Sequence, residues 1–334
     1  MKKTLFERRI LRLENTLLKR VLALLGLIVF AAGLVLVPIA LYADSLYREA
    51  FNAKESKTRQ ENAEVTSFDL FAEENAHQTQ SRIAGWLSTV SSQEVTVSSS
   101  RAKLSATQYE PVGGDTNAPW AIVFHGGLGT DREQVMDIAC MLSLQGYRVL
   151  TPDLYAHGKS EGAASTLGYG DAQDVRAWID YVQKTQMGAR IVLFGQDEGA
   201  AAVLMAACDG LGESVAAVAA DSACDDGVSG LLALAGMQEG DINAFLLELM
   251  FKRKTGFDGA KLSERIAQAD VPLLLIHGTG DQVVPAWHSE DIALAAGDSA
   301  QLLYVEGAGH GLSRFLEPQT VYDALLAFYE NALK

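Results

Sequence analysis

The sequence is short of cysteine and of basic residues. Its three cysteines, Cys140, Cys208 and Cys224, form no Cys-x-x-Cys pair and no cysteine–histidine spacing typical of zinc, so we expect no metal. We interpret them as small buried residues, although a Cys208–Cys224 bridge remains open. Lysine and arginine number 27 against 42 acidic residues, for a formal charge of −15. This balance argues against nucleic-acid binding and against a domain lying flat on anionic lipid.

Long apolar runs are also scarce, and the longest stands near the N-terminus. Residues 21–43 contain no charged side chain, and about 20 apolar residues suffice to span a bilayer. Residues 1–20 form a basic tail, which the positive-inside rule places in the cytoplasm. A cleaved signal peptide usually has an apolar region of about 7–15 residues and a small-x-small site, which Leu41-Tyr42-Ala43 fits poorly. We predict a single-pass anchor in the cell membrane, with the following domain outside the cytoplasm.

The remainder divides into a linking region and one large domain. Residues 44–90 begin with a polar, charged stretch that predicts a stalk, followed by an amphipathic helix ending near Trp86. Residues 91–334 alternate apolar runs with helical stretches, which is typical of a mostly parallel sheet covered on both faces. Alternating polar and apolar residues over 93–110 predict a β-hairpin at the start of this domain.

Within the domain, residues from about 224 to 270 interrupt the alternation. Two short apolar stretches predict a small helical cap, and the basic run Lys252-Arg253-Lys254 is typical of a helix C-terminus. This segment contains neither tyrosine nor tryptophan.

The most informative motif is Gly195-Gln196-Asp197-Glu198-Gly199, between an apolar run and an alanine-rich run. Strand, sharp turn and helix in this order are the layout of a nucleophile elbow, G-x-S-x-G. Gly195 and Gly199 are expected because larger side chains would clash where the turn folds back. The nucleophile position holds Asp197 instead of serine.

Three further motifs occur around the elbow: His125-Gly126-Gly127, the stretch His277-Gly278-Thr279-Gly280-Asp281, and Ala308-Gly309-His310. Together, over roughly residues 90–334, they resemble the α/β-hydrolase family in type and order. The closest resemblance is to bacterial membrane-anchored hydrolases of the serine-aminopeptidase-like or esterase-like type, whose elbow usually reads G-x-S-M-G.

The resemblance implies an α/β-hydrolase fold, a doubly wound and mostly parallel sheet with a small helical cap. It implies that Asp197 is the nucleophile, Asp281 the orienting acid and His310 the base. The resemblance also implies that the backbone N–H groups of Gly127 and Glu198 form the oxyanion hole. It implies no cofactor, and a small-molecule substrate whose class the sequence does not reveal.

Aspartate at the elbow also resembles haloalkane dehalogenases and epoxide hydrolases, where a carboxylate attacks an sp3 carbon. Dehalogenases commonly have tryptophan where this chain has Glu198, whose charge would repel a leaving anion. Epoxide hydrolases donate protons from cap tyrosines, and here the nearest tyrosines in sequence are Tyr155 and Tyr169.

Three hypotheses therefore stand: a hydrolase using Asp197, a hydrolase-fold binding protein that has lost turnover, and a hydrolase in which His310 and Asp281 act as a general base without a covalent intermediate. In each, Asp197, Glu198 and Asp281 favour the protonated form of His310.

Other polar residues are interpreted as structural. We expect the histidines at strand ends and in loops to fix turns, His288 to lie on a helix surface, and the strand-ending aspartates to cap turns or helices. Ser222 is discounted as a displaced nucleophile because it is not on the elbow. The residues so interpreted are His125, His157, His277, His288, Asp153, Asp221 and Ser222.

Overall fold

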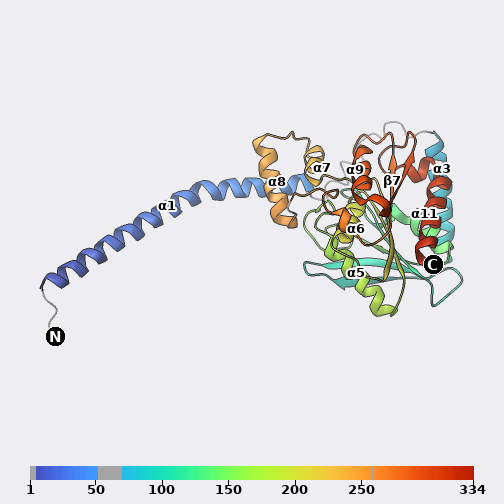
Figure 1. The fold of residues 1–334 in the computed structure, drawn as a ribbon, viewed down its shortest axis with the longest axis horizontal. Coiled ribbons are helices and arrows are strands. Elements are labelled where there is room, and N and C mark those ends of the chain that lie inside the picture. The colour runs from blue at the N-terminus through green and yellow to red at the C-terminus, as the bar shows by residue number, and fades with distance from the viewer. Residues whose placement is uncertain (1–4, 52–69, 258) are drawn as a thin grey trace. The chain divides into compact units, whose positions relative to one another are not determined.

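The structure, a computed structural model, describes residues 5–51, 70–257 and 259–334. It divides into two units, residues 1–46 and 47–334, which are described separately (Figure 1). The first unit lies in helix α1 (Leu5–Phe51). Within α1, Leu18–Phe51 is long and apolar enough to cross a membrane, and no part of its most apolar window is buried. By length and composition, membrane anchors and N-terminal signal sequences both meet this criterion.

The second unit is built on one eight-stranded sheet in the order β1-β2-β4-β3-β5-β6-β7-β8. The strands β1 to β8 are Ser92–Ser98, Lys103–Tyr109, Trp120–Phe124, Arg148–Pro152, Ile191–Gln196, Val215–Asp221, Leu273–Gly278 and Ala300–Val305. β1, β2 and β4 pair antiparallel, and β4, β3, β5, β6, β7 and β8 pair parallel. The expected mostly parallel sheet is confirmed, and β1 with β2 forms the hairpin predicted over 93–110.

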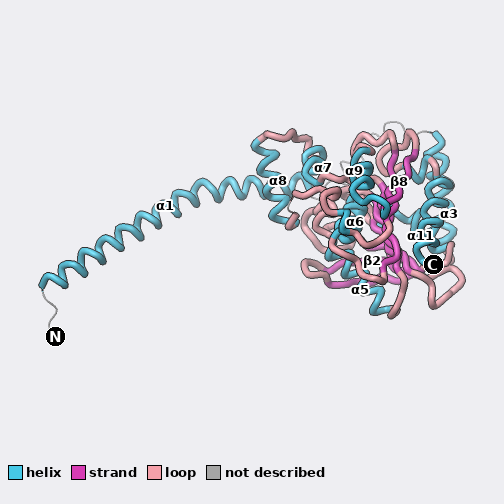
Figure 2. The backbone as a smooth tube through the Cα atoms, viewed as in Figure 1, coloured by secondary structure: helices cyan, strands magenta, loops and turns pink. Residues whose placement is uncertain are grey.

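Helices cover both faces of the sheet, with the strands between them (Figure 2). The helices that follow α1 are α3 (Leu70–Leu87), α4 (Met136–Leu144), α5 (Ala172–Thr185), α6 (Glu198–Cys208), α7 (Gly227–Leu234), α8 (Ile242–Thr255), α9 (Trp287–Ala296), α10 (Ser313–Leu316) and α11 (Pro318–Leu333). Short 3-10 turns lie at Arg132–Val135, Ile266–Gln268 and Gly297–Ser299. α7 and α8 fall where the sequence predicts a cap.

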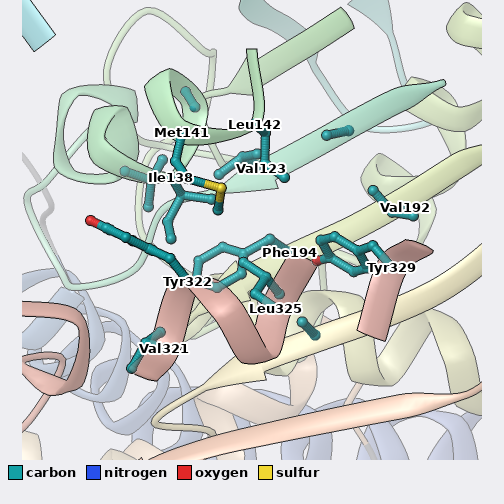
Figure 3. Packing of buried hydrophobic residues seen from close by; sticks show 14 of the residues in the cluster. Val123, Ile138, Met141, Leu142, Val192, Phe194, Val321, Tyr322, Leu325 and Tyr329 are labelled. Carbon is teal, nitrogen blue, oxygen red and sulfur yellow. The ribbon is translucent and has the colours of Figure 1, made fainter. Parts of the chain in front are cut away.

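The main core lies between the sheet and α3, α4 and α11. Val123 and Phe194 from the central strands meet Ile138 of α4 and Leu325 of α11, all of them fully or almost fully buried (Figure 3). Apolar residues on the sheet face and on one stripe of each helix produce this layer. It fixes the central strands, whose carboxyl ends carry the elbow and its neighbours.

The second unit begins inside α1. Tyr47 is 3% exposed and its hydroxyl donates to the Ser165 carbonyl at 2.9 Å. The Phe51 ring is fully buried, 6.2 Å from that of Phe251 in α8, and the Phe51 carbonyl accepts from the Ser165 N–H. The predicted stalk therefore starts as a packed helix end, and its continuation from residue 52 lies outside the described residues.

Candidate active site

The elbow lies at the junction of β5 and α6. Asp197 has φ 49° and ψ −110°, a conformation that costs free energy for a residue with a Cβ. A Cβ on Gly195 would lie 2.2 Å from the Gly199 carbonyl oxygen, and one on Gly199 would lie 2.4 Å from the His125 carbonyl oxygen. Glycine is required at both positions because the strand, the helix and the loop after β3 approach one another too closely for any side chain.

Asp281 is held rigidly just after β7. Its Oδ1 accepts from the N–H groups of Val283 and Val284 at 2.9 and 2.8 Å, and its Oδ2 lies 2.8 Å from His310 Nδ1. Burial would raise the pKa of Asp281, but hydrogen bonds with His277 and His310 outweigh it and hold the pKa below its usual range. Asp281 is therefore a carboxylate at neutral pH, suited to orient a neighbouring imidazole.

His310 lies between two carboxylates. Its Nδ1 faces Asp281, and its Nε2 lies 3.5 Å from Asp197 Oδ2. Burial would lower the pKa of His310, but the charges and hydrogen bonds of Asp197 and Asp281 outweigh it and raise the pKa to about 11. The sequence predicts that neighbouring acids favour the protonated form of His310, and the two carboxylates beside its ring explain this shift. His310 is therefore an imidazolium at neutral pH.

The loop after β3 reaches the elbow. A Cβ on Gly126 would lie 2.5 Å from Asp197 Cβ, so this turn packs directly on the nucleophile position. Gly127 has φ 85°, which favours glycine, and the Thr130 hydroxyl donates to its carbonyl at 2.8 Å. Among the described residues, no acceptor pairs with the N–H of Gly127 or of Glu198. Both donors are available for a ligand.

The Glu198 side chain is turned into the protein. It is 4% exposed, accepts from the Ser165 hydroxyl at 2.7 Å, and lies 3.3 Å from His157 Nε2. Its Oε1 has no hydrogen-bond partner within the described part of the chain. Burial raises the pKa of Glu198, and the Asp197 charge adds to this, while His157 and Ser165 oppose it. The sequence leads us to expect the Glu198 charge near the leaving group and His310, but the carboxyl instead lies against Ser165 and His157.

Most of the other histidines fix loops, as expected. His125 Nε2 accepts from the Leu154 N–H at 3.0 Å. The Ser289 hydroxyl lies 2.6 Å from His277 Nδ1, and His277 Nε2 lies 2.7 Å from the Val284 carbonyl. The interpretation of His288 was wrong: it is 5% exposed, and its Nδ1 accepts from the Asp225 N–H. The cap folds back over this side of α9, and the sequence does not show that contact.

The strand-ending aspartates are held by buried arginines. Asp153 pairs with Arg132 and accepts from the Lys159 N–H. Asp221 accepts from the Ser222 hydroxyl at 3.0 Å and lies 3.6 Å from Arg314. Their predicted role as simple caps is incomplete, because each neutralises a cation.

Neither candidate tyrosine is placed as a proton donor. The Tyr169 hydroxyl donates to the Cys224 carbonyl at 2.6 Å and the side chain is 5% exposed. The Tyr155 ring lies under the Arg101 guanidinium, 4.1 Å away.

The structure also tests the expectations for cysteine pairing and metal-binding groups. Cys140, Cys208 and Cys224 are free thiols, so the bridge left open between the last two is not formed. Across residues 5–51, 70–257 and 259–334, no group of three or more His, Cys, Asp or Glu side chains is placed to hold a metal ion.

A cavity of about 990 Å³ lies beside the elbow, under α3. Its wall includes Gly129 and Thr130, next to the Gly127 donor, and His157, next to Glu198. Apolar side chains of α3 face the charged pair Glu94 and Lys159 across it. Asp197, Asp281 and His310 do not line this cavity, so the catalytic candidates lie outside it.

Comparisons with known proteins agree with this architecture. The model of the alpha/beta hydrolase family matches residues 121–324, more than half of the chain. The chain belongs to the α/β-hydrolase family.

The chain is also similar to individual relatives in sequence and to solved structures in fold. The Mycobacterium tuberculosis protein Rv2307c is 29% identical over 221 residues, which cover 66% of this chain and 73% of that protein. Escherichia coli YfhR is 28% identical over 56% of this chain and 61% of its own length. The Pyrococcus furiosus esterase Pf2001 superposes with a TM-score of 0.59 at 20% identity, over 73% of this chain and 93% of that one. A bacterial membrane phospholipase A superposes with a TM-score of 0.54 at 15% identity, over 80% and 94%. These structures support the fold alone.

Proposed function

We propose that this protein is a membrane-anchored hydrolase in which Asp197 is the nucleophile, Asp281 orients His310, and His310 activates the water that completes turnover. The observation that carries the proposal is the charged relay itself, with His310 Nδ1 2.8 Å from Asp281 and Nε2 3.5 Å from Asp197. This relay occupies the turn that presents the nucleophile in the α/β-hydrolase family.

The charge of the relay selects the first chemical step. A serine nucleophile needs a neutral histidine, whereas a carboxylate needs no deprotonation. Attack by a carboxylate on an ester or amide would give an anhydride, which is unfavourable. Attack by Asp197 on an sp3 carbon instead forms an alkyl ester, while the leaving group departs with the electron pair of the broken bond. The substrate class we favour is therefore an electrophilic alkyl compound, such as an alkyl halide or an epoxide.

The same charge then switches His310 to its second role. The negative charge of Asp197 helps to raise the pKa of His310. Esterification removes this charge, so the pKa of His310 falls. The imidazolium then releases its proton to solvent, and neutral His310 takes a proton from water as hydroxide adds to the Asp197 carboxyl carbon. The N–H groups of Gly127 and Glu198 stabilise the oxyanion of this intermediate. On its collapse the bond to the alkoxide breaks, and the alkoxide takes the proton from His310 and leaves as the alcohol. The Asp197 carboxylic acid then gives its proton to His310, which restores the carboxylate and the imidazolium.

A second function, ligand binding without turnover, is favoured by one observation. The buried Glu198 carboxyl adjoins the elbow, and neither Tyr155 nor Tyr169 is placed to protonate a leaving group. A non-covalent general-base hydrolase is less consistent with the site, because His310 carries a proton in the free protein.

The proposed location follows from the N-terminal helix. The apolar run at 21–43 crosses the membrane, the basic residues before it stay in the cytoplasm, and residues 47–334 lie outside. The same run places the hydrolase beside the membrane surface.

The test is to trap the alkyl ester in a His310→Gln variant, which keeps the nucleophile and lacks the base for the second step. The full-length variant is incubated with a primary alkyl bromide or with a terminal epoxide, and its mass is measured. We expect a stable adduct that peptide mapping places on Asp197. Asp197→Asn is the matched control and remains unmodified. Absence of an adduct with both probes, together with no turnover by the wild type, would favour the binding function.

A further inference from the structure

Helix α8 is apolar on two opposite sides. Ala244, Leu247, Met250 and Phe251 face the protein and are buried. On the other side, Ile242, Phe245 and Leu249 are 71%, 58% and 52% exposed. Their spacing of three and four residues aligns them on one helix face. Exposed apolar faces of this kind mark surfaces that meet a membrane or another molecule.

The last turn of the same helix is basic. Lys252, Arg253 and Lys254 follow directly on the apolar face. Glu248 is the single acidic residue of α8, and Lys252 Nζ lies 2.6 Å from its Oε1. This helix is thus cationic in a chain of net charge −15. The expectation that the domain avoids anionic lipid applies to its overall charge and not to this helix.

The buried side of α8 is joined to the end of α1. Phe251 packs on Phe51, the last residue of α1. Only Asp44, Ser45 and Leu46 separate the apolar run 21–43 from Tyr47, the first residue of the domain. At about 3.5 Å a residue, this stretch reaches no further than about 14 Å. The short covalent link therefore keeps the residues on which α8 packs close to the end of the apolar run 21–43.

We propose that α8 lies in the headgroup layer of a phospholipid bilayer, with Ile242, Phe245 and Leu249 inserted among the upper acyl chains. Arg253 in the basic last turn then extends toward lipid phosphates, as basic side chains at membrane interfaces do. The inference rests on the proposed membrane anchor and deepens it, because the cap becomes a second contact between the domain and lipid. Figure 1 shows α7 and α8 beside each other at one end of the hydrolase unit. The exposed fractions of Ile242, Phe245 and Leu249 show that the described residues do not cover this face of α8.

The experiment places tryptophan on α8 in the full-length protein. Phe245→Trp and a matched control, Leu294→Trp, are reconstituted in phosphatidylcholine–phosphatidylglycerol vesicles with or without brominated acyl chains. Leu294 is an 83%-exposed apolar residue of α9, so it reports on exposure without membrane contact. The native tryptophans Trp86, Trp120, Trp178 and Trp287 set the background, which the wild type measures.

We expect brominated lipid to quench the added fluorescence of Phe245→Trp by about half, since an interfacial helix sits about 5–10 Å into the headgroup and acyl boundary. The added fluorescence of Leu294→Trp should not change. Arg253→Glu in the Phe245→Trp background should reduce quenching with phosphatidylglycerol present and have less effect in phosphatidylcholine alone.

The outcomes separate this inference from the anchor on which it rests. If the full chain does not float with the vesicles, both the anchor and the inference are wrong. If it floats and the two tryptophan variants are quenched alike, the anchor stands and the inference is overturned. An emission shift at residue 245 that grows with protein density and ignores bromine would assign the face to a second copy of the chain, and this also overturns the inference.

Discussion

Two regions around the elbow treat buried charge in opposite ways. On the side of His310, each charge has a partner: Asp281 receives two backbone N–H groups and His310, and buried Arg314 pairs with Asp137 at 2.6 Å. On the side of Glu198, the carboxyl has one hydroxyl donor and a histidine, and its Oε1 has no partner among the described residues. Asp281 is thus fully hydrogen-bonded, whereas Glu198 keeps one oxygen without a donor, as do Asp137 and Asp221 beside Arg314 among the described residues. What sets the two sides apart is the arginine, since no such cation lies against Glu198 among the described ion pairs.

The largest effect is expected from removing the Asp197 charge. Because Asp197 and Asp281 raise the pKa of His310 to about 11, the wild-type histidine is protonated at pH 7 and cannot serve as a base for a hydroxyl nucleophile. Asp197→Ser removes the charge and supplies a hydroxyl beside His310. We expect hydrolysis of p-nitrophenyl butyrate to rise by about 10²–10⁴-fold over the wild type.

The matched control is Asp197→Asn, which removes the charge and supplies no nucleophile. It should leave the ester intact and move the His310 titration, followed by NMR, from about pH 11 toward its ordinary value. The sign for stability follows from the raised pKa. Wild-type stability from the raised pKa is fully present below about pH 6.5 and is lost as pH rises through about 11, whereas the variant keeps only the part that Asp281 supplies. An unchanged His310 titration would contradict the assignment of Asp197 as its partner.

The next effect tests the support of His310. In the Asp197→Ser background, Asp281→Asn should lower kcat by about 10³-fold, because the imidazole loses the carboxylate that fixes its tautomer. KM should change little, since Asp281 does not line the cavity beside the elbow. An equal fall caused by His277→Gln would instead indicate that the loop geometry, and not the carboxylate, is decisive.

The third effect concerns stability on the paired side. Arg314 donates to Asp137 and to the Gly311 carbonyl beside His310, and it is 1% exposed. Arg314→Met leaves the Asp137 carboxylate buried without its cation, so the free energy of unfolding should fall by about 3–5 kcal/mol. Chemical denaturation measures it. The double variant Arg314→Met/Asp137→Leu should recover part of the loss, because Asp221 still lacks its cation. A double variant no more stable than Arg314→Met would contradict the assignment of the loss to the unpaired Asp137 carboxylate.

The smallest effect is of opposite sign and lies on the unpaired side. Glu198→Gln keeps an oxygen for the Ser165 hydroxyl and removes the buried charge, so it should stabilise the protein at pH 7 by about 1 kcal/mol. Because burial raises the pKa of Glu198, the wild type loses stability as pH rises from about 4.5 through the folded-state value. The difference between the two proteins should vanish below about pH 4.5, and a constant difference would exclude a charge effect.

The sequence predicts what depends on local pattern. The strands, the elbow glycines and the order Asp197, Asp281, His310 follow from apolar runs and short motifs, and the structure brings these three side chains together. It does not predict what depends on the way that side chains turn. The Glu198 charge is expected beside the leaving group and His310, yet the side chain points inward to Ser165. The sequence predicts His288 on a helix surface, but in the structure the loop that carries Asp225 covers it.

The seating of Tyr47 and Phe51 on Ser165 determines where this protein can be cut. Ser165 receives the end of α1 on its backbone and gives its hydroxyl to Glu198, so the two contacts share one residue. A protease that cleaves before Tyr47 would release a domain that keeps Tyr47 and Phe51 in place. Cleavage after Phe51 would remove both side chains, which would leave a cavity beside Phe251 and the Ser165 N–H without its acceptor. A soluble form of the hydrolase domain should therefore begin before Tyr47, inside α1, and not after Phe51.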